Sequence, residues 1–524
     1  MRVMPAGVWR SATRPVARHR LLSAALFLAL LLRIDAELGY RWQSWFNDSY
    51  SYVRAAVTLT PETTRPSGYS VFLWLLSPAH SYLLVTALQH LMGLLIAVMI
   101  YAVARHRFTA PAWLAVLATL PVLFDGFEIQ LEHLIMADTL FLFLAMAGIT
   151  VALWTPRPSW RACLAAGLLL GLSATVRSTG LPLLAAFVIY LLVTLLPARP
   201  IRWRSLPSGA QPGGTGGRPP GGYWRSWRTL IAGLAIGVIA FGVPLAGYEA
   251  WYDSAHGEYA MTDSTGVFLY SRVMTFADCA KMSLPADLQP LCTPVPPAQR
   301  PNGQDYIWKP VSPLLRLGHP EFSPVVNKRA ERFAIKAIEA QPLDYARAVW
   351  DDTVRSFEWN RSVFPNPQTY DGYLFGYTSP HIPLSPFGGY ATPEAYYVRA
   401  DTATAIVNPF AGLIRAYQRW VWLPGTVYGL ILLAGLYGIA RRWRRGGREA
   451  LLPWLCSVAL IVAPAATAEF DYRYVTTAVP FACLAVAVAF GSARLARRGA
   501  GGGPDSRLAD AGDDQRDLAP DTAA

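Results

Sequence analysis

The sequence predicts an all-α polytopic membrane protein with about ten transmembrane helices and an α-rich cap outside the cytoplasm. Of its 524 residues, 53% are hydrophobic and 15% are charged, a composition that is unusual for a soluble protein. Several apolar runs reach the roughly 20 residues that are needed to cross a hydrocarbon core of about 30 Å. The arginines gather beside these runs on alternate turns of the chain, and this positive-inside pattern predicts that both termini are cytoplasmic.

The net charge of +12 does not indicate a nucleic-acid partner. Nucleic-acid binding surfaces interleave basic and aromatic residues, whereas the basic clusters of this chain flank apolar runs. We therefore expect membrane lipids as partners and no nucleic acid.

The apolar runs divide the chain into six segments. The first run has the basic arm of a signal peptide, but it has no convincing small-residue cleavage site, although Ala36 leaves cleavage open; we expect a retained anchor. The segments are an N-terminal module at 1–200 with a first external loop at 39–79, a Gly/Pro-rich cytoplasmic linker at 201–228, a span at 229–251, an extracytoplasmic domain at 252–420, C-terminal spans within 421–498 and a disordered cytoplasmic tail at 499–524. Spans are expected at about 20–38, 80–104, 110–126, 134–154, 161–176, 180–197, 229–251, 421–440, 450–468 and 473–492. An apolar piece at 67–77 is too short to cross.

The extracytoplasmic domain has one clear helical pattern and one pair of cysteines. Apolar residues recur at helical spacing from Ser323 to Phe357, and the interruption at Gln341-Pro342 predicts two helices joined by a turn. Cys279 and Cys292 are the only cysteines of this domain. Because the compartment outside is oxidising, we expect a disulfide between them, with unpaired thiols as the alternative.

Ionisable residues at the outer ends of the spans are the candidate site. Such groups are costly at a membrane unless they are paired or functional, so we expect them to converge in one polar chamber. The outer ends of the spans carry Asp48, Arg65, Asp125, Glu128, Glu132, His133, Asp138, Arg177, Glu469, Asp471 and Arg473. The candidate site residues are the eight of these other than Asp125, Glu128 and Glu469.

The location of the chamber restricts its chemistry. No Walker loop or dinucleotide fingerprint is present, and cytosolic nucleotide donors do not reach the outer face. Group transfer there needs a donor that is already activated, such as a sugar on a polyprenyl phosphate. Asp48, set among aromatic residues that we expect to raise its basicity, is a candidate base for an acceptor hydroxyl. Arginine suits the departing phosphate, because its planar fork binds phosphate in a bidentate manner.

Several stretches also resemble a known family. They are the first loop with Asp48, Arg65–Tyr69, Glu132–Leu144, Gly167–Leu181 and Asp471–Tyr474 with Pro480. In their order and sidedness they resemble the GT-C glycosyltransferases, in particular the phospholipid-carrier-dependent enzymes related to protein mannosyltransferases and to the lipid A aminoarabinose transferase. The resemblance covers the first 200 residues well, the last span moderately and the outer domain hardly at all.

The resemblance implies a GT-C-like helix bundle and an inverting sugar transfer from a polyprenyl-phosphate donor, with Asp48 as general base. The other seven residues would bind substrate, and the acceptor, whether glycan, lipid or protein, stays open. Many family members carry two adjacent acids where this chain has Asn47-Asp48, which makes a metal site less expected. We predict no cofactor and name no metal ligands. A divalent metal stays open but has no support in the sequence, since no second His or Cys lies at ligand spacing from His133.

Simpler interpretations stay open for each residue. Asp48 and Asp138 suit helix caps, Arg65 suits a side chain that reaches the lipid headgroups, and Glu132-His133 suits a local polar pair. Gln89-His90 suits a packed pair inside a span, Arg177 and Arg473 suit interfacial anchors, and Asp471 is the expected partner of Arg473. For the whole protein the alternatives are a transporter or flippase of lipid-linked sugars and a cell-surface binding protein.

Overall fold

The computed structural model describes residues 19–41, 43–156, 158–195, 222–378, 393–399, 403–443 and 447–491. The predicted tail at 499–524, the N-terminal arm, Trp42 and the predicted linker up to residue 221 lie outside these residues. Residues 222–228, predicted as linker, are instead the first turns of α12 (Gly222–His256).

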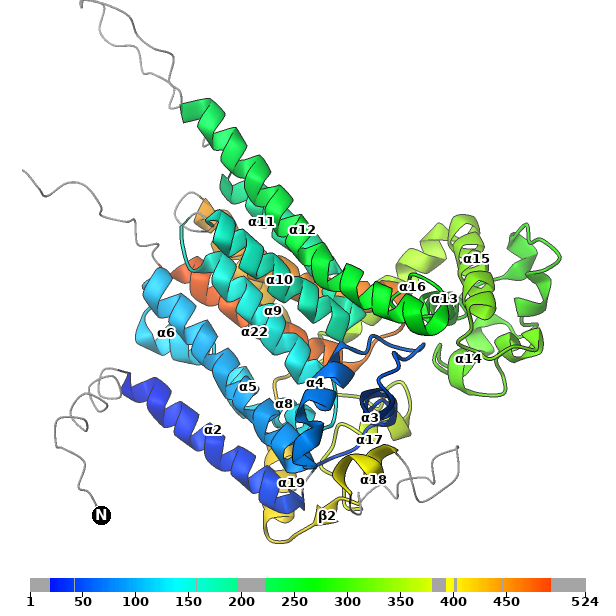
Figure 1. Cartoon of the computed structure of the whole chain (residues 1–524), viewed down its shortest axis with the longest axis horizontal. Coiled ribbons are helices and arrows are strands. Elements are labelled where there is room, and N and C mark those ends of the chain that lie inside the picture. Colours follow the sequence, from blue (N-terminus) through cyan, green and yellow to red (C-terminus); the bar gives the residue numbers. More distant parts are fainter. Residues whose placement is uncertain are drawn as a thin grey trace, which may run out of the picture. The chain divides into compact units, whose positions relative to one another are not determined.

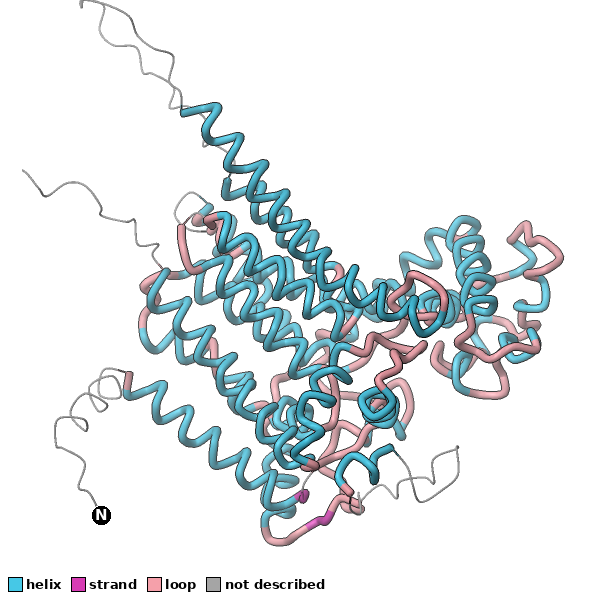
Figure 2. Tube along the Cα trace, in the orientation of Figure 1, coloured by secondary structure: helices cyan, strands magenta, loops and turns pink. Residues whose placement is uncertain are grey.

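Helices make up nearly all of the regular structure, as predicted (Figures 1 and 2). Within the described residues the only sheet pairs β1 (Tyr40–Arg41) with β2 (Ala405–Ile406), antiparallel, with Tyr40 opposite Ile406. This short ladder ties the end of the first helix to the end of the outer domain.

The apolar runs of the N-terminal module form helices close to their predicted bounds. The third predicted span is the exception, because it breaks into two short helices around Ala118 and Thr119, where Pro121 cannot donate a backbone hydrogen bond. The helices are α2 (Arg20–Gly39), α3 (Ser49–Thr58), α4 (Gly68–Leu76), α5 (Tyr82–Ala102), α6 (Ala112–Leu117), α7 (Leu120–Phe124), α8 (Gly126–His133), α9 (Asp138–Leu153), α10 (Trp160–Val176) and α11 (Pro182–Leu195).

Three helical stretches in the described residues are long and apolar enough to cross a membrane: Tyr82–Arg107, Ile231–His256 and Tyr472–Phe490. A fourth span would be the pair α19 (Phe410–Trp420) and α20 (Gly425–Arg441), which bend by 57° at their junction. Five further apolar helices are 10–17 residues long. These helices are those of a membrane protein, but the predicted count of about ten spans is not confirmed.

Helices α10 and α12 pack closely through small residues. A Cβ added at Gly167 would overlap the backbone oxygen of Gly237, and one at Gly171 would overlap that of Phe241. Two glycines four residues apart lie on one helix face, so their absent side chains let the two backbones touch. This contact fixes the end of α10, where Arg177 follows.

Residues 252–420, predicted to be extracytoplasmic and called the outer domain below, have their own core, formed by α13, α14 and α15 beyond the C-terminal end of α12 (Figure 1). The predicted helix pair is confirmed as α15 and α16, with the break at Gln341, and the predicted disulfide joins Cys279 and Cys292. Its helices before α19 are α13 (Thr265–Val273), α14 (Asp305–Trp308), α15 (Pro324–Ala340), α16 (Pro342–Arg355), α17 (Pro367–Asp371) and α18 (Pro393–Val398).

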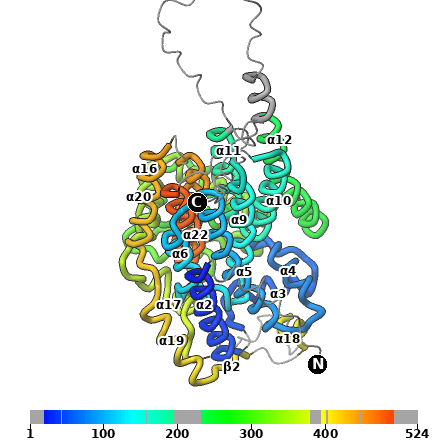
Figure 3. Tube along the Cα trace, turned by 90° about the vertical axis from the view of Figure 1, so that its left-hand side faces the viewer, coloured from blue at the N-terminus to red at the C-terminus, as the bar shows by residue number. Residues whose placement is uncertain are grey.

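The last helix lies at the centre of the bundle. α22 (Tyr472–Phe490) contacts α7, α8, α9, α20 and α21 (Leu451–Thr467), while α2 lies beside α5 and α19 (Figure 3). Arg473, in the first turn of α22, is therefore held among elements from both halves of the chain.

Candidate active site

Asp48 lies at the N-terminus of α3, yet its side chain does not cap the helix. Its carboxylate instead forms two ion pairs: Oδ1 lies 2.5 Å from Nη1 of Arg65, and Oδ2 lies 2.8 Å from Nη1 of Arg473. The side chains of all three residues are 15–16% exposed. Asp48 and Arg473, 425 positions apart in the sequence, thus meet in space. The simpler interpretations of Asp48 as a helix cap and of Arg65 as a lipid-facing side chain are not what the structure shows.

The basicity of Asp48 differs from the prediction. Burial alone raises the pKa of Asp48, but the guanidinium groups of Arg65 and Arg473 outweigh burial and hold this pKa below its ordinary value. We expected the aromatic surroundings to raise the basicity. That expectation is wrong, because the aspartate is paired with two cations.

Arg473 connects Asp48 to a second acid. Its Nε lies 3.2 Å from Oδ2 of Asp471, which confirms the expected pair, and the Tyr373 hydroxyl donates to the same oxygen at 2.8 Å. Burial raises the pKa of Asp471, with Arg473 and this hydroxyl acting in the opposite direction. The Arg473 guanidinium also lies over the ring of Phe46, 5.7 Å from its centroid. Its orientation is therefore fixed on several sides.

Arg177 and Asp138 form a buried ion pair beside this group. Arg177 directly follows α10, and its side chain is buried, so it is not an exposed anchor. Asp138 is the first residue of α9, and its side chain does not cap that helix. Burial, followed by the nearby positive charge of Arg473, lowers the pKa of Arg177. Arg177 and Arg473 both lie over the ring of Tyr474, with centroid distances of 5.4 and 5.6 Å. We call Asp48, Arg65, Asp138, Arg177, Asp471 and Arg473 the Asp48 cluster.

Glu132 and His133, predicted to bind substrate with the others, lie in a different group on α8. Arg33 of α2 donates from Nε and Nη2 to the two carboxylate oxygens of Glu132, at 2.8 and 2.6 Å. Burial raises the pKa of Glu132 to about 7, against the effect of Arg33, and burial together with His90 lowers the pKa of His133 to about 3. No hydrogen bond or ion pair joins Glu132 or His133 to the Asp48 cluster among the described residues.

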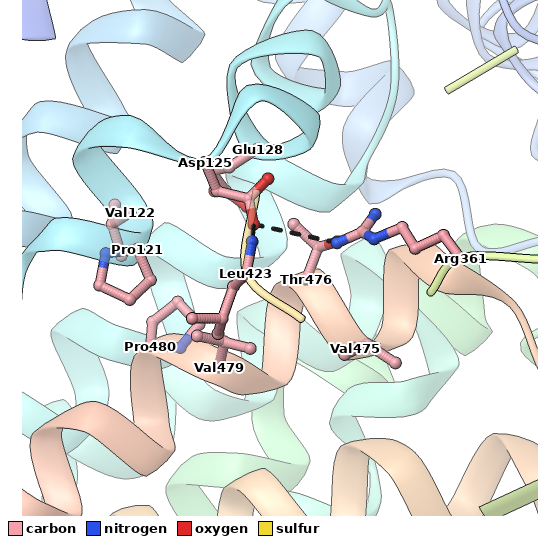
Figure 4. Close-up of a pocket in the computed structure, with 10 residues that line it drawn as sticks. All are labelled: Pro121, Val122, Asp125, Glu128, Arg361, Leu423, Val475, Thr476, Val479 and Pro480. Atoms are coloured by element: carbon pink, nitrogen blue, oxygen red, sulfur yellow. Dashed lines mark hydrogen bonds and ion pairs between the residues drawn. The ribbon is translucent and has the colours of Figure 1, made fainter. Parts of the chain in front are cut away.

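A small pocket lined by Asp125 and Glu128 contains a residue that the sequence did not single out. Arg361, from the outer domain, points toward Asp125, with 3.9 Å between Nη2 and Oδ2 (Figure 4). Its guanidinium lies 3.7 Å from the centroid of the Phe127 ring. A neighbouring pocket is lined by both Arg361 and Arg473, together with Tyr373 and other residues. Two cations from different domains therefore face one space.

Arg361 had no sequence signal, because no recognised motif reaches the outer domain. Arg33 did have one: it is a charge inside an apolar run, and such a charge needs a buried partner.

Residues 73–259 match the family model described as dolichyl-phosphate-mannose-protein mannosyltransferase. Over this segment, the match bears out the predicted resemblance to the protein mannosyltransferases. The glycosyltransferase-like segment contains Asp138 and Arg177, whereas Asp48, Arg65 and Arg473 lie outside it. No curated protein matches the chain.

Three solved structures are similar at low identity. The Saccharomyces cerevisiae protein O-mannosyltransferase Pmt1-Pmt2 complex, bound to the sugar donor, is 14% identical with a TM-score of 0.33, and the match covers 49% of this chain and 36% of that one. The oligosaccharyltransferase AglB from Archaeoglobus fulgidus, in complex with an inhibitory peptide and a dolichol-phosphate, is 14% identical with a TM-score of 0.40, over 90% of this chain and 50% of that one. ArnT from Cupriavidus metallidurans is 13% identical with a TM-score of 0.34, over 90% and 78%. All three TM-scores are low, so we draw no function from these structures.

Proposed function

We propose that this chain transfers a sugar from a polyprenyl-phosphate donor to an acceptor hydroxyl outside the cytoplasm, with inversion at the anomeric carbon. The observation that carries the proposal is the single carboxylate of Asp48, held between Arg65 and Arg473 beside a pocket that Arg361 and Arg473 share. The family match of residues 73–259 supports the same class of reaction.

The arginines are the groups that suit the donor phosphate. A lipid-linked sugar presents a phosphate whose charge grows as the sugar leaves, and fixed guanidinium groups stabilise such developing charge. We assign this role to Arg473 and Arg177, with Arg361 and Arg65 at the edge of the chamber. Each is already paired with a carboxylate. The donor phosphate therefore has to exchange with a carboxylate rather than occupy a vacant cation site.

This exchange activates Asp48. When Arg473 turns to the phosphate, one of the two cations that lower the pKa of Asp48 is drawn away, and the aspartate becomes a stronger base. The acceptor hydroxyl then gives its proton to Asp48 while its oxygen bonds to the anomeric carbon. The bond from that carbon to the phosphate oxygen breaks, and the polyprenyl phosphate leaves with the electron pair. One carboxylate is enough because the leaving group is already good.

The test uses the full chain in liposomes with polyprenyl-phosphate mannose as the first donor and a native membrane extract as the source of acceptor. It measures the polyprenyl phosphate that is released only when the extract is present. Asp48→Asn should lower turnover by a factor of about 10²–10⁴, the usual contribution of a general base. Glu62→Gln is the matched control, since Glu62 is a buried acid of the same loop that pairs with Arg54 at 2.6 Å. The assignment is wrong if Asp48→Asn protein turns over like Glu62→Gln protein.

A further inference from the structure

Three side chains of metal-ligand type converge at the end of α2: Glu37, His90 of α5 and His133 of α8. Oε1 of Glu37 lies 3.7 Å from Nε2 of His90 and 3.9 Å from Nδ1 of His133, and the two ring nitrogens are 3.3 Å apart. The side chain of His133 is fully buried, that of His90 is 6% exposed and that of Glu37 is 14% exposed. We call these three residues the Glu37 cluster.

The outer nitrogen of each imidazole is already engaged. Nε2 of His133 lies 2.8 Å from the backbone oxygen of Tyr40, which only accepts, so this nitrogen carries the proton. Nδ1 of His90 lies 2.8 Å from Oε2 of Glu132, a carboxylate whose two oxygens also accept from Arg33. With Glu132 ionised opposite Arg33, these contacts set both tautomers. In neutral rings they leave a lone pair on Nδ1 of His133 and on Nε2 of His90, the two atoms that face each other.

Glu37 adds a third acceptor to the same point. Neither of its carboxylate oxygens has a hydrogen-bond partner among the described residues, although both are buried. The Thr86 hydroxyl is within hydrogen-bond reach of this carboxyl, but its single proton is already directed at the backbone oxygens of Tyr82 and Leu83, 3.2 Å away. Buried acceptors that face one another without a donor are costly. A cation between them would remove that cost.

We propose that Glu37, His90 and His133 bind a divalent transition-metal ion, with Zn²⁺ as the best fit. For a triangle with sides of 3.3, 3.7 and 3.9 Å, the point equidistant from the three atoms lies about 2.1 Å from each, within the range of Zn–N and Zn–O bonds of about 2.0–2.2 Å. Two imidazoles and one carboxylate suit Zn²⁺ and its first-row neighbours, whereas Mg²⁺ and Ca²⁺ prefer oxygen ligands. A small shift out of the plane leaves room for a fourth ligand, such as water.

The surrounding residues support the ligands as metal sites require. Glu132 and the Tyr40 carbonyl orient the two rings, and Arg33 in turn holds Glu132. The site also connects to the loop that carries Asp48, because the backbone N–H of Ser44 donates to the carbonyl of His133 and that of Ile135 donates to Ser44. The ion would therefore join α2, α5 and α8 and hold this loop in position, as a structural rather than a catalytic metal.

The rival occupant is a proton shared between the two rings, with His90 as an imidazolium. The test is metal analysis by mass spectrometry of the full chain, purified in detergent from Zn²⁺-supplemented cells and washed free of loose metal. We expect about one Zn²⁺ per chain, and near-background metal in Glu37→Gln and His90→Ala. His106→Ala is the matched control, because His106 lies at the other end of the α5 segment against Trp154, outside the Glu37 cluster. It should keep the ion.

A second measurement covers variants that fail to fold. A zinc chelator should lower the thermal midpoint of the wild type and of His106→Ala, but it should not change that of Glu37→Gln. Replacement of Zn²⁺ by Co²⁺ should give visible absorption that Glu37→Gln lacks. Wild-type protein that holds no more metal than Glu37→Gln, with a midpoint indifferent to chelator, would overturn the proposal and leave the shared proton as the explanation. The Asp48→Asn protein should keep its metal, which separates this inference from the proposed transfer.

Discussion

The Asp48 cluster and the Glu37 cluster are two polar groups in one helix bundle, and they are built on opposite principles. In the Asp48 cluster every charge already faces an opposite charge, so a ligand has to exchange with a carboxylate. In the Glu37 cluster three acceptors face one another without a donor, so a cation would be added. The comparison teaches that the charge of a buried group is not enough to indicate its ligand. What matters is whether that group already has a hydrogen-bond or ion-pair partner in the protein.

The largest expected effect is on stability, at the Arg33–Glu132 pair. Glu132 is paired with a cation, as the acids of the Asp48 cluster are, and it also contacts His90 of the Glu37 cluster. Glu132→Ala leaves the Arg33 guanidinium buried without its carboxylate, and loss of one partner of a buried ion pair costs about 3–5 kcal/mol. We expect this fall in the free energy of unfolding in detergent. Arg33→Met combined with Glu132→Leu should recover most of it. Equal stability of the single and the double variant would mean that the pair is not the source of the loss.

Arg473 tests the exchange principle. Arg473→Ala removes a cation from the leaving phosphate, and loss of one such group typically lowers turnover by a factor of about 10²–10³. Arg473→Lys should recover only part of the rate, because lysine keeps the charge without the planar fork. The measurement is kcat with saturating donor. A lysine variant that matches the wild type would show that charge alone is needed.

Arg361 should have a smaller and different effect. It lines the pocket but contacts Asp125 rather than Asp48, so we assign it to donor binding. Arg361→Ala should raise the donor KM by about tenfold, or about 1.4 kcal/mol, with kcat nearly unchanged. Arg355→Ala, on a partly exposed arginine of the same domain, is the control. A fall in kcat with an unchanged KM would place Arg361 in the chemical step instead.

The smallest effect is a dependence on pH. The folded-state pKa of Asp48 lies below its ordinary value, so its stabilising contribution is present above about pH 4 and is lost as the pH falls toward the folded pKa. The stability advantage of the wild type over Asp48→Asn should therefore shrink below about pH 4. Thermal midpoints of both proteins measured between about pH 6 and 3 provide the check. An advantage that grows on acidification would contradict the ion pairs.

The sequence predicted the fold better than the site. Apolar runs and breaking prolines are local signals, so the helix bounds and the break at Gln341 followed from them. Pro121 was an equally local signal, but the prediction of a single span at 110–126 did not take it into account. The small number of helices that pass as full spans did not follow, because run length says little about where a helix bends or breaks.

Site residues were predictable only where a motif marked them. Asp48, Arg177 and Arg473 stand in family-like stretches, and the structure brings them together. The ligands of the Glu37 cluster come from three helices, with His90 and His133 43 residues apart, so a rule based on local ligand spacing missed them. No second His or Cys lies at ligand spacing from His133 along the sequence, but His90 lies beside it in space. Arg361 likewise reaches the pocket through tertiary packing alone.

The most direct test of the proposed function is a mass balance on the donor with the wild-type chain in sealed liposomes. Donor labelled in the sugar and in the phosphate should be split, with free polyprenyl phosphate in the membrane and the sugar bound to acceptor through an inverted glycosidic bond. Movement of intact donor across the bilayer, with both labels still on one molecule, would contradict transfer and identify a transporter.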